Sequence, residues 1–158
     1  MGIFRKKPNH KPSLFEIENA GDFRLELSAV LKIYDREDCD EKFIAGLNHP
    51  QRVLALCMML EDCGQTGMIF NFFEEFPSYV QESINALKEI GALKSAELIK
   101  QAWELQPKGC DGNEWRDGTS EKLWEKLEKI DRKFAGYPDG HLDPLYKQYA
   151  EKHKKVLL

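Results

Sequence analysis

Residues 48–60 read Asn-His-Pro-Gln-Arg-Val-Leu-Ala-Leu-Cys-Met-Met-Leu, and this stretch indicates the fold class. Asn48 followed by Pro50 is typical of a helix start, because proline lacks a backbone N–H and the first turn of a helix needs none there. The apolar run over 53–60 is continuous rather than amphipathic, which is typical of a helix at the centre of a fold. We therefore expect a buried central helix, with Cys57 as one of its small apolar side chains.

The segments around this stretch carry apolar residues at helical spacing, three and four residues apart. The expected helices cover residues 23–34, 69–76, 80–90, 93–105, 120–135 and 145–156. Together with the central helix they predict an all-α single domain of about seven helices over residues 13–158. Residues 1–12, with Lys and Arg at four positions and two prolines, predict a flexible basic arm.

Local signals set the expected helix ends. Ser13 with Glu16, and Ser78 with Gln81, fit capping boxes at helix starts. A glycine-bracketed break is expected over residues 64–67. The phenylalanine-rich run after it is expected to pack in the core.

Composition excludes several broad classes of protein. The chain has 158 residues, of which 42% are hydrophobic and 32% charged, too apolar for a disordered chain and too interrupted by charge for a membrane-spanning one. Its net charge of −4 argues against a general basic nucleic-acid binder. The four cysteines form no Cys-x-x-Cys pair, which favours a reduced, cytoplasmic protein.

The charge is unevenly distributed along the chain. Residues 1–12 carry four basic and no acidic side chains, whereas residues 13–107 carry 8 Lys and Arg against 17 Asp and Glu, a net charge of −9. No Lys or Arg occurs from residue 53 to residue 87. The acids expected to form a partner-binding face are Asp35, Glu37, Asp38, Asp40, Glu41, Glu61, Asp62, Glu74, Glu75 and Glu82. The competing interpretation is that these acids are the ordinary solvated faces of amphipathic helices.

Catalytic and metal-binding motifs are missing from the sequence. The four histidines show neither His-Glu-x-x-His nor clustered Cys and His spacing, and no phosphate loop or nucleophile elbow occurs. We therefore expect no catalytic residues, metal or cofactor. The alternative is a small hydrolase-like enzyme that uses carboxylates and His141 near the loop at residues 106–118.

Motifs over residues 60–105 resemble the bacterial DNA-mimic protein family, whose domain is otherwise mostly of unknown function. The motifs are Glu61-Asp62, Ile-Phe-Asn-Phe-Phe at 69–73, Ile-Asn-Ala-Leu-Lys-Glu-Ile-Gly-Ala at 84–92 and Ala-Glu-Leu-Ile at 96–99. Looser matches extend the resemblance to about residues 47–149. The family's usual Asn-Gly-Gly-Phe is replaced here by Gln-Thr-Gly-Met at 65–68, so no individual residue role is transferred to this stretch.

The resemblance implies an all-helical fold and an acidic surface that imitates duplex phosphates. We accordingly expect a non-enzymatic protein-interaction module whose partner is a basic or DNA-binding protein. Direct nucleic-acid binding and a membrane span are not expected. The oligomeric state stays open, a homodimer included.

Overall fold

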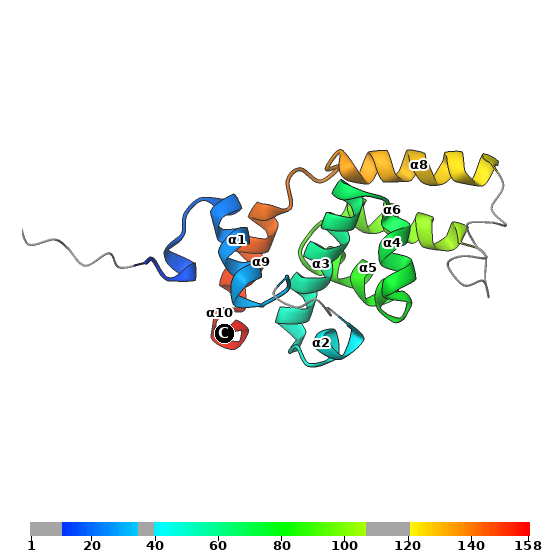
Figure 1. Ribbon diagram of the computed structural model, residues 1–158. Helices are drawn as coiled ribbons and strands as arrows, with labels where there is room; N and C mark the ends of the chain where they lie inside the picture. Colours follow the sequence, from blue (N-terminus) through cyan, green and yellow to red (C-terminus); the bar gives the residue numbers. More distant parts are fainter. Residues whose placement is uncertain (1–10, 35–39, 107–120) are drawn as a thin grey trace, which may run out of the picture.

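Helix α3, His49–Thr66, lies at the centre of the molecule, as the run over residues 48–60 predicts (Figure 1). The computed structural model describes residues 11–34, 40–106 and 121–158. Every residue from Val53 to Leu60 is buried, so α3 presents apolar side chains in all directions to the helices around it. Asn48 caps its start by accepting a hydrogen bond from the Gln51 backbone N–H, and Pro50 lies in the first turn.

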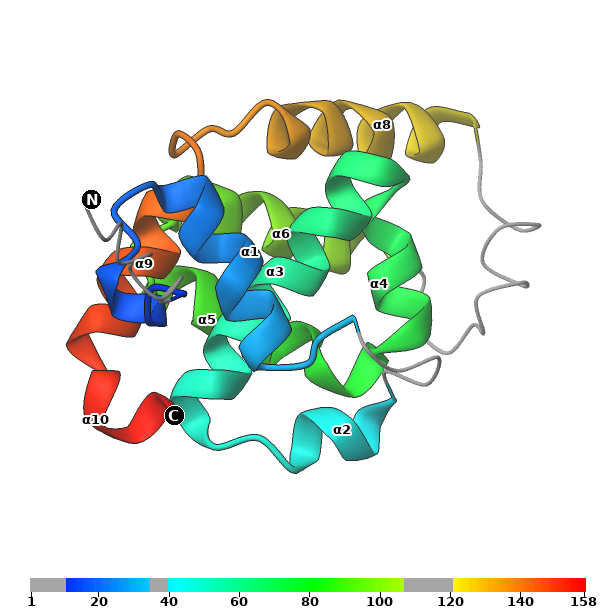
Figure 2. The same ribbon diagram turned by 60° about the vertical axis from the view of Figure 1, so that its left-hand side comes forward.

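The other helices surround α3. They are α1 (Ala20–Val30), α2 (Glu41–Ala45), α4 (Ile69–Glu75), α5 (Val80–Glu89), α6 (Leu93–Leu105), α8 (Glu121–Ala135), α9 (Asp143–Lys152) and α10 (Lys154–Leu157), with 3-10 turns at Leu14–Glu16 and Pro77–Tyr79. At one end α1 packs against α9, and on the other side of α3 the helices α5, α6 and α8 pack in sequence (Figures 1 and 2). The described residues contain no strand, so the all-α prediction is confirmed.

The described residues form nine α-helices rather than about seven. The short helix α2 was not predicted, because five residues are too few to show a helical period. The helix expected over 145–156, with Asp143-Pro144 as its predicted start, does begin at Asp143, but it is divided at His153, whose φ of −107° and ψ of 16° interrupt it. The basic arm, apart from residues 11 and 12, falls outside the described residues.

Two predicted helix ends are wrong. The helix at residue 49 does not break at Gly64 but continues to Thr66, with Gly67 as its C-cap. Gly64 is needed for contact, because a Cβ there would stand 2.5 Å from the ring of Phe134 on α8. Ser78 does not cap α5; it lies in the 3-10 turn, and α5 begins two residues later with no side-chain cap.

Other helix ends follow the sequence. Gly91 after α5 has a φ of 95°, a conformation that glycine adopts without steric cost. The carboxylate of Glu16 accepts a hydrogen bond from the Ser13 backbone N–H at 2.6 Å, although only a 3-10 turn follows. The C-terminal residues are fixed to the start of α3, because the side chains of Asn48 and Gln51 donate to the carbonyls of Val156 and Leu157.

The core contains the aromatic run that the sequence predicted to be buried. Phe70 and Phe73 on α4 pack edge-on against Trp124 and Trp103, with ring centroids 5.5 and 5.1 Å apart. Such edge-to-face pairs add to the stabilisation from burial. Within residues 11–34, 40–106 and 121–158, we find no helix with both the length and the apolar character to cross a membrane.

Candidate functional site

The acids predicted to form one face occupy different environments. Asp35, Glu37 and Asp38 lie outside the described residues. Glu61, Asp62 and Glu82 take part in contacts with tyrosine or arginine side chains, whereas four others lie exposed at the surface. The structure therefore divides the predicted set into three groups.

Glu61 is buried, with 4% of its surface exposed, and it is not part of any external face. Its carboxylate accepts hydrogen bonds from the hydroxyls of Tyr137 at 2.9 Å and Tyr146 at 2.6 Å. Arg24 stands 3.5 Å away and supplies the opposite charge. Burial and the negative Glu61 raise the pKa of Tyr137 to about 12, so this hydroxyl keeps its proton and donates.

Arg24 on α1 also holds Asp62, the next residue on α3. Its guanidinium lies 2.8 Å from the Asp62 carboxylate and 3.4 Å from that of Asp143 at the start of α9. Burial alone would lower the pKa of Arg24, yet the charges of Glu61 and Asp62 raise it. Tyr34 donates a further hydrogen bond to Asp62. This Arg24 cluster links α1, α3 and α9 and is a structural centre rather than a free anionic surface.

Glu82 on α5 is paired with Arg52 on α3. The guanidinium Nε donates to the carboxylate at 2.6 Å, and both side chains are partly exposed. A duplex mimic needs negative charge without nearby compensation. Glu82 therefore adds less to an acidic surface than its position between residues 53 and 87 suggested.

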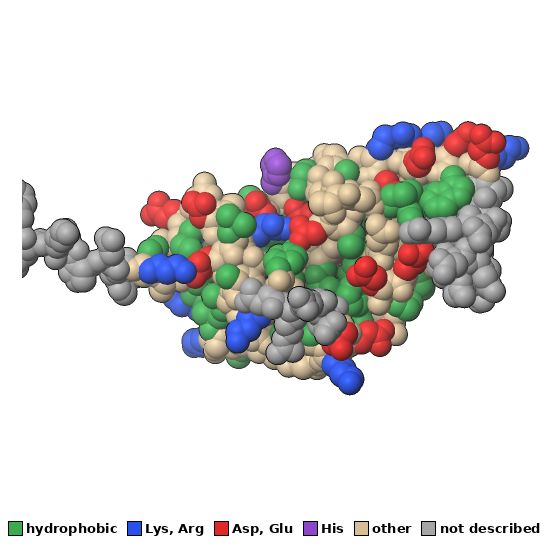
Figure 3. All heavy atoms as spheres, in the orientation of Figure 1, with side chains coloured by type: hydrophobic (Ala, Val, Ile, Leu, Met, Phe, Trp, Pro, Cys, Tyr) green, Lys and Arg blue, Asp and Glu red, His purple; other side chains and the backbone are tan. Residues whose placement is uncertain are grey.

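Asp40, Glu41, Glu74 and Glu75 remain exposed, and we call these four residues the α2–α4 patch. Asp40 caps α2 by accepting from the Phe43 N–H, and Glu41 follows it in the first turn. The Tyr79 hydroxyl, just beyond α4, reaches the Glu41 carbonyl at 3.4 Å, so the two pairs of acids come from neighbouring elements. Figure 3 shows acidic side chains over α2 and α4 on one face.

Cys63 lies close enough to Glu75 and Asp62 for their charges to act on its thiol. Its thiol lies on α3, and its pKa is raised to about 11 by burial and by the charges of Glu75 and Asp62. Both carboxylates therefore act on the same atom, so their fields overlap where α3 meets α4. A thiol with so high a pKa stays protonated and is a poor nucleophile at neutral pH.

A second polar cluster joins the start of α3 to the ends of α5 and α9, and it was not predicted from the sequence. Glu89 accepts hydrogen bonds from Tyr149 at 2.6 Å and interacts with His49 at 3.0 Å. The ring of His153 stacks on Tyr149, with centroids 4.3 Å apart. Burial would raise the pKa of Glu89, but these partners lower it. His49 lies 40 positions before Glu89 and Tyr149 lies 60 positions after it, so no local sequence pattern could predict this cluster.

The enzyme alternative involved His141 and the segment at 106–118. His141 is exposed and stacks on Tyr137, with ring centroids 4.6 Å apart. Apart from Gln106, that segment lies outside the described residues. Three surface hollows, two between α6 and α8 and one between the end of α1 and the C-terminal residues, contain at most one carboxylate each and no histidine. Over the described ranges, no group of three or more His, Cys, Asp and Glu side chains could hold a metal ion.

The family comparison agrees with the sequence motifs. Residues 45–153 match the sequence profile of the DMP19-like protein family, a family of DNA-mimic proteins. The chain belongs to this family. The matched range runs from the end of α2 to the end of α9 and includes the predicted stretch 47–149. No curated protein and no solved structure matches the chain.

Proposed function

We propose that this DMP19-like protein is a non-enzymatic regulator that presents the α2–α4 patch to the DNA-binding surface of a basic protein. The observation that carries the proposal is that two exposed acids at α2, Asp40 and Glu41, lie on the same face as two exposed acids on α4, Glu74 and Glu75. The family supports it, because DNA mimicry works by binding a DNA-binding protein. Protein interaction is thus the activity that chemistry and family membership both favour.

The arrangement of charge supports an electrostatic role for the patch. Residues 53–87 contain no Lys or Arg, and Arg24 on α1 and Arg52 on α3 are engaged by Asp62 and Glu82. Lys42 on α2 is an exposed basic side chain beside the four acids. On the described part of this surface, a basic partner therefore meets more acidic than basic side chains. Such complementary potentials raise association rates and set orientation more than they raise affinity.

The competing interpretation is that the patch is only the solvated side of two helices. It predicts that the four acids are interchangeable with any other exposed acids. Glu125 and Glu128 on α8 offer that comparison, because both are exposed and lie on a helix of mixed charge. Reversing either pair changes the net charge of the chain equally.

The experiment is affinity capture at low salt with the full chain, followed by identification of the captured proteins. We expect a DNA-binding protein that elutes as NaCl rises, since exposed charge pairs are screened over a Debye length of about 8 Å at physiological ionic strength. The E74K/E75K variant should fail to capture it, whereas the E125K/E128K variant should capture it normally. The purified chain should also displace duplex DNA from that protein.

Three results would overturn the proposal. One is the absence of any DNA-binding protein among the captured species. Another is equal capture by the E74K/E75K and wild-type chains. The third is a ternary complex in which the partner holds DNA and this chain together, because a mimic and DNA exclude one another.

A further inference from the structure

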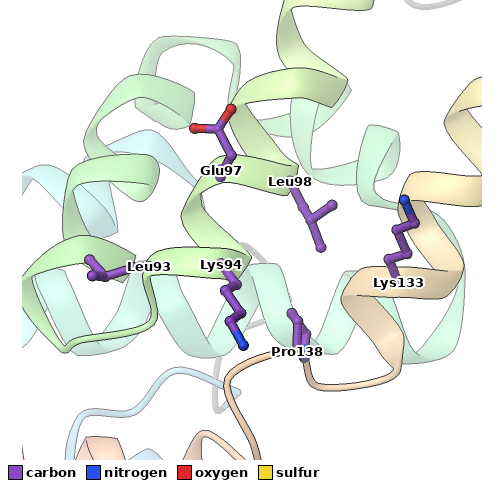
Figure 4. A pocket seen from close by; sticks show the side chains of 6 residues that line it. All are labelled: Leu93, Lys94, Glu97, Leu98, Lys133 and Pro138. Carbon is purple, nitrogen blue, oxygen red and sulfur yellow. The ribbon is translucent and has the colours of Figure 1, made fainter.

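A groove lined by apolar and lysine side chains, in contrast to the acidic α2–α4 patch, runs between α6 and α8. It consists of two hollows of about 440 and 390 Å³ that share Lys133. Figure 4 shows the first, where Leu98 and Pro138 face the opening between Lys133 and Lys94. Leu93, at the same end, is 61% exposed and so is accessible to a partner.

The rim of this groove is cationic in a chain that is acidic overall. Four lysines line the two hollows against two glutamates, namely Lys94, Lys126, Lys129 and Lys133 against Glu97 and Glu104. In the part of the chain that the structure describes, no ion pair engages any of these four lysines. The groove thus has apolar anchor points along its floor and unneutralised positive charge along its edges.

We propose that the α6–α8 groove binds an acidic amphipathic helix of a partner protein. Apolar side chains of that helix enter the two hollows, and its acidic side chains meet the lysines on the rim. This site is separate from the α2–α4 patch and takes a partner of opposite charge, so it does not depend on the proposed DNA mimicry.

The dimensions of the groove favour a helix as the occupant. Helix α6 has 13 residues, which makes it about 20 Å long at a rise of 1.5 Å per residue. The apolar lining extends from Leu93 at its start to Leu105 at its end, with Ile130 on the facing helix. Two hollows in line along such a length match apolar anchors one to two turns apart on a docked helix. Because the rim of the groove is cationic, we expect acidic side chains at those positions of the docked helix that face the rim.

The test is a selection of helix-forming peptides of about 14 residues by the full-length protein, the length that spans the groove. We expect enriched peptides with net negative charge and with Leu, Ile or Phe three and four residues apart. Affinity of a selected peptide, measured by fluorescence anisotropy, should fall about tenfold or more in the K126E/K133E variant, because attraction becomes repulsion. The R132E variant is the control, since Arg132 is exposed on the same helix and lines neither hollow.

A second pair of variants tests the apolar anchors. Leu93→Ser should weaken peptide binding about tenfold, the loss expected from removing a buried leucine contact. Leu25→Ser is the matched control, because Leu25 on α1 is 64% exposed and lies outside the groove. Leucines this exposed in the free protein contribute little to folding, so both variants should keep the wild-type melting temperature.

The proposal is overturned if selection enriches neutral or basic peptides, or if the K126E/K133E variant binds the peptides as tightly as R132E does. It is also overturned if a DNA duplex competes with the peptides for the lysines. If the chain is a dimer in solution and the K126E/K133E variant alone makes it monomeric, the occupant is a second copy of the chain and not an acidic partner.

Discussion

Glu61 carries a negative charge into the core, where three side chains from three parts of the chain surround it. Removing the carboxylate leaves two tyrosine hydroxyls without an acceptor, whereas Arg24 keeps its ion pairs with Asp62 and Asp143. Removing one tyrosine hydroxyl leaves the charge still neutralised. The two changes therefore differ in kind as well as in size.

We expect Glu61→Ala to lower the free energy of unfolding by about 2–5 kcal/mol, because two tyrosine hydroxyls lose their acceptor at about 1–3 kcal/mol each. Tyr146→Phe should lower it by about 1.5–3 kcal/mol, since one hydrogen bond to a charged acceptor is lost. Urea denaturation measures both. The exposed Glu75→Ala serves as control and should stay within about 0.5 kcal/mol of the wild type. A Glu61→Ala chain as stable as this control would contradict the assigned role.

We expect Glu89 to make the free energy of unfolding depend on pH in the acid range. Its pKa is lower in the folded chain than in the unfolded one, so the folded state binds fewer protons in the acid range. This contribution is complete above the ordinary glutamate pKa of about 4.3 and is lost as pH falls through the folded value. Unfolding free energies of Glu89→Gln should therefore depend less on pH than those of the wild type between about pH 5 and 3. Glu125→Gln, at an exposed acid, should keep the wild-type slope.

At the scale of elements, the predictions succeeded where a long apolar period defines a helix and failed where a distant contact sets its end. Helix α6 has the predicted bounds, Leu93–Leu105, because its apolar residues repeat over more than three turns. Gly64 was interpreted as a break, since glycine disfavours helix interiors. The reason for that glycine is Phe134, 70 positions away on α8, which nothing near residue 64 reveals.

Gly64→Ala tests this interpretation of the α3–α8 contact. Alanine is the better helix former by about 1 kcal/mol, so a simple helix break would give a more stable variant. We expect a loss of about 1–3 kcal/mol instead, from overpacking against the aromatic ring of Phe134. In a Phe134→Leu background the same substitution should be less harmful, which a double-mutant cycle would measure. Gly46→Ala is the control, because its Cβ would meet only ordinary contacts at 3.5 Å.

At the scale of the molecule, summing charges along the sequence located the acidic region but not its free charge. The count of −9 over residues 13–107 already includes Arg24 and Arg52, but it does not show that these arginines pair with Glu61 and Glu82. Charge sums along the chain also hide the lysines of α6 and α8, which alternate with glutamates in the sequence yet line one groove. Packing between helices determines which charged side chains form ion pairs and which face of the molecule they lie on. Only the structure therefore separates an acidic patch from a basic groove.

Two faces of opposite charge on different helices should act independently. Charges further apart than a Debye length of about 8 Å are largely screened at physiological salt, and effects at distant sites add. The E74K/E75K variant should therefore lose the basic partner and bind the acidic peptide unchanged, while K126E/K133E should do the reverse. Isothermal titration of both ligands against both variants measures all four affinities. If net charge governed binding, E74K/E75K would instead strengthen the peptide complex, and E125K/E128K would weaken the basic partner equally.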